Sequence, residues 1–412
     1  MRTTWNVMGA VTTLALLTAT APAAPAPAET PRGQALALNQ ITGDDAVMGR
    51  IFELIEDARH TKPLLEEAAK MAKEKDQPFN INATWILART AQLLKQTDAG
   101  VAFYKLFLDQ AAQLRSPEKI SEGYAGLIET LYSGGKYEES EKACTEFLDL
   151  KGDAALQLRK PAVLRQMVLV LAKEGKTDKA SDLIDKIVKA QPDNPLNQIA
   201  KGVFLREIDK PAEAVKAYET AIDLFKKDED LTKEQRDEFI DGIRYTLSGL
   251  HIDLNDVDKA AADLKALLEK DPDNPGYNND LGYIWADHDM NLPESEKLIR
   301  KAIEEEKKQR LKANPELKAD DAKDNASYLD SLGWVLFKEK KYKEALGPLE
   351  EAVKDPDAQS IEIYDHLAEV QMATGDKSAA VATWKKGLEL PADTKREKQK
   401  KVEVEKKLKA NE

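Results

Sequence analysis

The residues that could bind a metal or act as acid–base catalysts are scattered along this sequence. The four histidines are His60, His251, His288 and His366. The stretch Asp287-His288-Asp289 contains suitable metal ligands, but adjacent residues of a helix point to different faces, and a zinc site needs further histidine or cysteine ligands close by. We therefore expect no metal site.

Nucleophilic and phosphate-binding patterns are equally weak. Ser116-Pro117-Glu118-Lys119 matches S-x-x-K, but the partner motifs of that nucleophile are missing, so a loop between helices is the simpler interpretation. The chain contains no P-loop, G-x-G-x-x-G, H-E-x-x-H or C-x-x-C-H sequence. We predict that the protein is not an enzyme and binds no cofactor.

The periodicity of the apolar residues is far more informative than these motifs. Between Asn325 and Pro356, apolar residues at three- and four-residue steps predict two amphipathic helices joined by a lysine-rich turn. Gly333 and Ala345 are small at the point where the two helices would cross, which allows their backbones to approach closely. One such pair cannot bury its own apolar face and needs neighbouring pairs.

Similar pairs occur along the chain. Taking the position of Gly333 as a marker, the equivalent residues are Val168, Gly202, Ser248, Gly282, Gly333 and Ala368. Steps near 34 residues with helix–turn–helix content are typical of tetratricopeptide repeats. The chain thus resembles the tetratricopeptide repeat (TPR) superfamily. The resemblance implies an all-α fold, a right-handed superhelical solenoid of antiparallel helix pairs.

This interpretation divides the chain into segments. The expected segments are a signal peptide (1–28), a flexible linker (29–43), an N-terminal helical cap (44–80), two degenerate TPR-like repeats (81–160), six TPR units (161–390) interrupted by charged insertions at 226–239 and 304–324, and a charged C-terminal capping helix or tail (391–412). For the second insertion, an extended solvated helix is favoured over a docking element.

The first 28 residues resemble a secretory signal. Arg2 precedes a modest apolar run, and Ala26-Pro27-Ala28 offers small residues for cleavage. No cysteine suitable for lipid attachment follows the run, and Cys144 is the single cysteine of the chain. We expect an exported protein, periplasmic or secreted, with no membrane span after signal cleavage.

Charge limits the choice of partner. The formal net charge of −13 argues against nucleic acid, which requires a clustered basic face. In TPR proteins the first helices of the pairs line a concave groove for peptides or partner helices. Transferring that frame to this sequence and adding the neighbouring Asp287 gives the candidate partner-binding residues Tyr245, Asn279, Tyr283, Asp287, Asp330, Trp334, Phe337, Asp365 and Glu369.

These residues combine aromatic rings with amides and carboxylates, as the energetically dominant residues of interfaces do. The resemblance implies a non-catalytic scaffold or adaptor of the bacterial cell envelope that binds a protein with basic and apolar residues. Two alternatives stay open: Trp334 and Phe337 only pack against the adjacent repeat, or the chain is a structural solenoid that self-associates.

Overall fold

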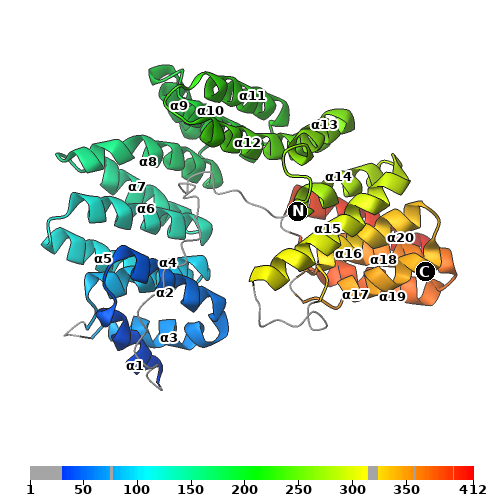
Figure 1. The fold of residues 1–412 in the computed structure, drawn as a ribbon, viewed down its shortest axis with the longest axis horizontal. Helices are drawn as coiled ribbons and strands as arrows, with labels where there is room; N and C mark the ends of the chain where they lie inside the picture. Colours follow the sequence, from blue (N-terminus) through cyan, green and yellow to red (C-terminus); the bar gives the residue numbers. More distant parts are fainter. Residues whose placement is uncertain (1–29, 75–77, 314–322, 357, 393) are drawn as a thin grey trace. The chain divides into compact units, whose positions relative to one another are not determined.

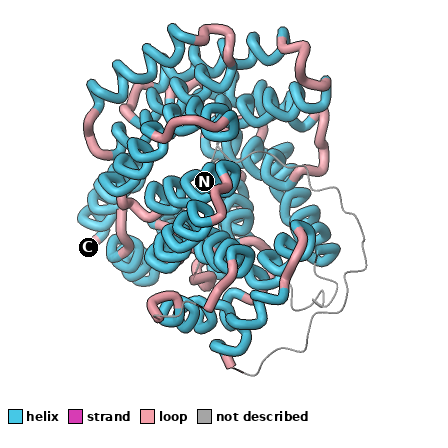
Figure 2. The backbone as a smooth tube through the Cα atoms, turned by 90° about the vertical axis from the view of Figure 1, so that its left-hand side faces the viewer, coloured by secondary structure: helices cyan, strands magenta, loops and turns pink. Residues whose placement is uncertain are grey.

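The computed structural model describes residues 30–412 except 75–77, 314–322, 357 and 393. Within these ranges the chain is α-helical, with one short 3-10 helix and no strand (Figures 1 and 2). It divides into two compact units, Met1–Lys227 and Asp228–Glu412. The expected signal peptide at 1–28 lies outside the described residues. No helix of the described ranges is long and apolar enough to cross a membrane.

The first unit contains an N-terminal helix followed by five helix pairs. The bounds are α1 Pro31–Ala37, η1 Leu38–Gln40, α2 Asp44–Glu56, α3 Ala58–Met71, α4 Ile81–Leu93, α5 Thr97–Gln113, α6 Pro117–Ser133, α7 Tyr137–Asp149, α8 Ala154–Lys173, α9 Thr177–Ala190, α10 Pro195–Glu207 and α11 Pro211–Lys227.

The second unit contains four pairs and a terminal helix. The bounds are α12 Lys233–Asp253, α13 Val257–Leu268, α14 Pro275–Asp287, α15 Leu292–Ala313, α16 Ala326–Lys338, α17 Tyr342–Ala352, α18 Ile361–Thr374, α19 Lys377–Glu389 and α20 Lys395–Asn411.

The prediction of a flexible linker over 29–43 is wrong for most of that segment. Pro31 starts α1 in the position that proline favours, and the Thr30 hydroxyl accepts a hydrogen bond from the Gly33 N–H at 3.2 Å. Ala35 and Leu38 are buried in the core of the first unit. Two apolar side chains therefore fix a segment whose composition alone is typical of a linker.

The helix boundaries follow the capping residues. In the two Pro-Asp-Asn-Pro segments, Asn194 accepts the Leu196 N–H at 3.0 Å and Asn274 accepts the Tyr277 N–H at 3.1 Å, one at the start of α10 and one at the start of α14. In the insertion at 226–239, Thr232 forms a capping box with Gln235 and thereby starts α12. Of the insertion at 304–324, residues up to Ala313 extend α15, and residues 314–322 lie outside the described ranges.

Within each pair, small residues allow the two helices to pack closely. A Cβ at Gly333 would overlap the side chain of Leu349, and one at Gly282 would overlap Ile299. Between pairs, a lysine in the helix–helix turn reaches back to the second helix of the preceding pair. Examples are Lys136 to Asp98 (2.6 Å), Lys176 to Glu141 (2.6 Å) and Lys341 to Glu296 (2.7 Å).

Within each unit, the first helix of each pair joins it to the preceding pair. In the second unit α14 contacts α16 and α16 contacts α18, and each second helix contacts the first helix of the following pair, as α15 contacts α16 and α17 contacts α18. The helix α20 contacts both α18 and α19, as α18 contacts both α16 and α17. It therefore takes the place of the first helix of a further pair and ends the stack.

Candidate binding surface

All nine predicted partner-binding residues lie on or next to the first helices of the second unit. We call the surface formed by α12, α14, α16 and α18 the first-helix face. The structure shows how these side chains are used within the chain, because most of them contact the next first helix along the stack.

A polar contact at one recurring position links successive first helices. In two of the pairs the residue three before the marker reaches the following pair: the Tyr245 hydroxyl donates to Asp280 Oδ2 at 2.6 Å, and Asp330 Oδ1 lies 2.9 Å from His366 Nδ1. Asn279, at the same position of the α14 pair, instead donates to Asp280 of its own helix. Asp365 stands at the same position of the last pair and contacts α20. The contact is therefore a device that joins one repeat to the next.

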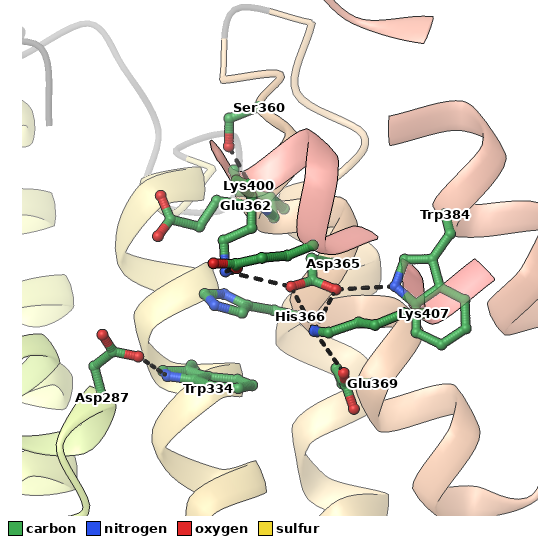
Figure 3. Close-up of polar contacts among 12 residues, drawn as sticks. Asp287, Trp334, Ser360, Glu362, Asp365, His366, Glu369, Trp384, Lys400 and Lys407 are labelled. Atoms are coloured by element: carbon green, nitrogen blue, oxygen red, sulfur yellow. Dashed lines mark hydrogen bonds and ion pairs between the residues drawn. The ribbon is translucent and has the colours of Figure 1, made fainter. Parts of the chain in front are cut away.

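Four rings form a continuous aromatic cluster across α14, α16 and α18. Trp334 stacks on His366 with ring centroids 4.1 Å apart and on Phe337 at 5.1 Å, and Tyr283 lies 6.3 Å from His366. The Trp334 indole N–H donates to Asp287 Oδ1 at 3.1 Å (Figure 3). Trp334 thus packs against the following repeat, and Phe337 stacks on Trp334 within α16, although both rings remain partly exposed.

His366 is the buried centre of this cluster, with 2% of its residue surface exposed. Burial opposes its protonation, but Asp330, Glu362 and Asp365 together raise the pKa of His366 above its ordinary value. The imidazolium form therefore stabilises three carboxylates that come from two neighbouring helices.

A second chain of contacts crosses the face from α14 to α20. The Tyr283 hydroxyl donates to Glu362 Oε1 at 3.0 Å, and Arg396 of α20 donates to the same oxygen at 2.6 Å. Burial and the Glu362 carboxylate raise the pKa of Tyr283 well above its usual value, so its hydroxyl keeps its proton. Tyr283 of α14 thus reaches Glu362 of α18, the first helix two pairs further along the stack.

The last carboxylates of the face hold lysines of α20. Lys407 Nζ lies 2.8 Å from both oxygens of Asp365 and 2.6 Å from Glu369 Oε1, and Lys400 lies 3.4 Å from Asp365 (Figure 3). The Trp384 indole N–H also donates to Asp365 at 2.9 Å. Burial alone would raise the pKa of Asp365, but Lys407, followed by Lys400, brings it below the ordinary value.

The predicted residues differ in their access to an outside partner. Asn279, Asp330 and Asp365 are 6%, 7% and 2% exposed, because they lie between successive helices. They cannot contact a partner while the present packing persists. Asp287 is exposed, and Tyr245, Tyr283, Trp334, Phe337 and Glu369 are partly exposed.

Sequence reasoning missed Glu362, His366, Arg396 and Lys407 as members of this surface. His366 stands two residues before its marker, the position that Asp280 holds in an earlier pair, so the ladder of contacts has a regular place in the repeat. Glu362, Arg396 and Lys407 carry no such signal, because their contacts depend on how α18 and α20 are stacked.

The residues of the stretch 287–289 also make contacts within the chain. Asp289 pairs with Lys338 at 3.1 Å, and His288 Nδ1 lies 2.9 Å from the carbonyl oxygen of Ile284. Across the described part of the chain, no group of three or more histidine, cysteine, aspartate or glutamate side chains is arranged to hold a metal ion.

Comparison with known proteins agrees with this architecture. The model of the family described as Tetratricopeptide repeat matches residues 245–309, which cover all of α13 and α14, the C-terminal part of α12 and most of α15. Residues 245–309 therefore match the tetratricopeptide repeat family. A TPR repeat-containing protein of Pseudomonas aeruginosa is 30% identical over 211 residues, which are 51% of this chain and 30% of that protein. The chain thus spans less than a third of the length of that curated relative.

Solved TPR structures resemble it at low sequence identity. The crystal structure of a tetratricopeptide repeat protein from Parabacteroides merdae is 14% identical with a TM-score of 0.46, covering 69% of this chain and 98% of that one. Yeast Tom70 is 16% identical with a TM-score of 0.49, covering 92% of this chain and 81% of that one.

Proposed function

We propose that this TPR protein is a non-catalytic scaffold whose first-helix face, over residues 228–412, binds a protein segment that carries basic and apolar residues. TPR proteins generally mediate interactions between proteins, which supports the broad function. The observation that carries the finer proposal is the set of ion pairs between α18 and α20. Its carboxylates Glu362, Asp365 and Glu369 already hold the cations of a basic helix.

The chemistry of the remaining face suits the same partner. Asp287 is exposed beside the partly exposed Trp334 ring, and the Lys338 ammonium lies 5.1 Å from the centre of that ring. A carboxylate beside an aromatic surface favours a lysine or arginine whose aliphatic stem packs on the ring. An acidic peptide would meet repulsion from Asp287 and Glu369.

The absence of catalysis is part of the proposal. The polar groups of the face are bonded to one another. The Tyr283 hydroxyl donates a hydrogen bond to Glu362, and His366 contacts both Asp330 and the Trp334 ring. No nucleophile stands beside a base with an open space in front of it among these contacts. The arrangement supports recognition rather than a reaction.

We also propose that the protein works outside the cytoplasm, in the cell envelope. The charged start, apolar run and small residues of the first 28 positions support this. Cell fractionation followed by mass spectrometry of the N-terminus tests it. The proposal requires a start near Glu29 in the envelope fraction, and a cytoplasmic chain that retains Met1 or Arg2 would exclude it.

Affinity capture from an envelope extract tests the binding proposal. The full chain is compared with Asp287→Lys, which reverses an exposed charge beside Trp334, and with Glu344→Lys, which makes the same change at an exposed site on α17. Helicity is verified for all three proteins. We expect one partner to be lost only with Asp287→Lys. Equal capture by all three would remove the first-helix face from consideration.

A concentration series by light scattering accompanies the capture, because self-association is the competing explanation for partly exposed rings. Growth in size with concentration, abolished by Asp287→Lys, would favour a self-associating solenoid.

A further inference from the structure

The terminal helix α20 covers the acidic end of the stack largely through charged side chains. Arg396 pairs with Glu362 at 2.6 Å, and Lys407 pairs with Asp365 at 2.8 Å and with Glu369 at 2.6 Å. Arg396 is exposed, and salt weakens ion pairs of this kind.

The apolar attachment of α20 is small by comparison. Val404, 1% exposed, packs with the core that contains Ile361 and Trp384, while Leu408 is partly buried and Val402 is half exposed. The helix α18, which holds the equivalent place one pair earlier, is anchored by more apolar side chains. In α18 the buried apolar residues are Ile361, Ile363, Leu367, Ala368 and Val370.

The carboxylates of α18 that α20 covers require a positively charged partner. Asp365 is nearly fully buried, and a buried carboxylate without a positive partner is unfavourable. Trp384 supplies one neutral hydrogen bond to it, and the positive charge comes from Lys400 and Lys407. When α20 is absent, another basic helix is the occupant whose chemistry matches.

We propose that α20 is a displaceable occupant of this face, held in cis, and that a basic amphipathic helix of another protein binds by replacing it. The proposal rests on the proposed function and adds its regulation. The matching pattern is a cation, a second cation four residues later, an apolar residue after four more, and a third cation after three. Arg396, Lys400, Val404 and Lys407 show it on one side of a helix.

Because α20 already occupies this face, a partner helix must compete with it. A short tether gives α20 an effective concentration on the order of millimolar at its own site. A partner therefore binds weakly to the intact chain and more tightly once the contacts of α20 are weakened.

The test uses a fluorescent peptide of residues 394–412 as the probe and full-length chains as receptors. One receptor is the native chain, the second carries Arg396→Glu and Lys407→Glu, and the third carries Lys406→Glu and Lys409→Glu. The third pair makes the same charge change at exposed positions of α20 outside the ion pairs described above. Hydrogen exchange of residues 395–411 reports whether α20 has left.

We expect the Arg396→Glu/Lys407→Glu chain to show faster exchange in α20 and to bind the peptide about tenfold more tightly than the native chain, since the ion pairs of Arg396 with Glu362 and of Lys407 with Asp365 and Glu369 are lost. The Lys406→Glu/Lys409→Glu chain should match the native one. Equal peptide affinity in all three chains, with α20 released in the second, would overturn the proposal.

A milder variant covers the case in which the double reversal unfolds the end of the stack. Lys407→Gln should release α20 in part and raise peptide affinity a fewfold; unchanged exchange and affinity in this variant would also overturn the proposal. The peptide comes from the chain itself, so the result does not depend on the unknown partner. Peptide binding without a captured partner would reject only the proposed function, and the reverse result would reject only the displacement.

Discussion

Asp330 and His366, 36 residues apart in sequence, lie 2.9 Å from each other between α16 and α18, and both are nearly fully buried. The pair joins two repeats at the point where the Trp334 ring stacks on the imidazole. Removing one partner leaves a buried charged or polar group unpaired. We expect Asp330→Ala to lower the free energy of unfolding of the second unit by about 3 kcal/mol, measured by urea denaturation.

The pH dependence of stability gives an independent test of the same pair. The folded-state pKa of His366 is raised, so its contribution is fully present below the unfolded pKa of about 6.5 and is lost as pH rises through the higher folded value. The free energy of unfolding should therefore fall as pH increases above about 6.5. His366→Asn should flatten this decline. A decline that persists in His366→Asn would contradict the assignment.

Trp334 should behave as a packing residue when it is truncated. Trp334→Ala removes the ring that contacts both His366 and Phe337, and we expect a loss of about 2–3 kcal/mol, near the lower end for a large aromatic because the ring is partly exposed. Trp334→Phe keeps a ring and loses the N–H donated to Asp287, which should cost about 1 kcal/mol. Thermal melts of the two variants decide this. Equal stability of Trp334→Ala and the native chain would mean that the ring does not join the repeats.

Close helix packing within a pair can be tested with two helical glycines of the second unit. Gly333→Ala places a Cβ against Leu349 and should destabilise the second unit by about 1–3 kcal/mol. Gly249→Ala, at an exposed position of α12 with open space around the new Cβ, should stabilise it by about 0.5–1 kcal/mol because alanine favours a helix. Effects of the same sign in chemical denaturation would refute the packing explanation for Gly333.

Asp365 should matter more for the end of the stack than an exposed acidic residue of α20. Asp365→Asn keeps the shape and removes the charge that Lys400 and Lys407 contact, so amide exchange in α20 should become faster. Glu405→Gln, at an exposed position of α20, should leave that exchange unchanged. Unaltered protection in Asp365→Asn would show that Val404 and its neighbours hold the helix without the charges.

The sequence was sufficient for the helix pairs, because the features that create them are local. Gly333, the turn after Lys338 and the capping asparagines Asn194 and Asn274 act within one repeat, and the structure places them where the repeat pattern predicts. The helix α1 was missed because its stability comes from Ala35 and Leu38 packing on residues distant in the chain.

The surface was predictable only in part, for a similar reason. Positions counted from the marker residues select side chains on the first helices, but the exposure of these side chains depends on the next helix in the stack. Tyr283 and Glu362 are 79 residues apart and meet because α14 and α18 both pack against α16. The tail at 391–412 was expected to form a capping helix, yet nothing in its local pattern pairs Lys407 with Asp365.

Hydrogen exchange of the full chain, with and without the captured partner, tests the central claim most directly. Binding to the first-helix face predicts slower exchange in α14, α16 and α18, accompanied by faster exchange in α20 as it is displaced. Protection confined to α13, α15, α17 and α19, or to residues before Lys227, would contradict the account.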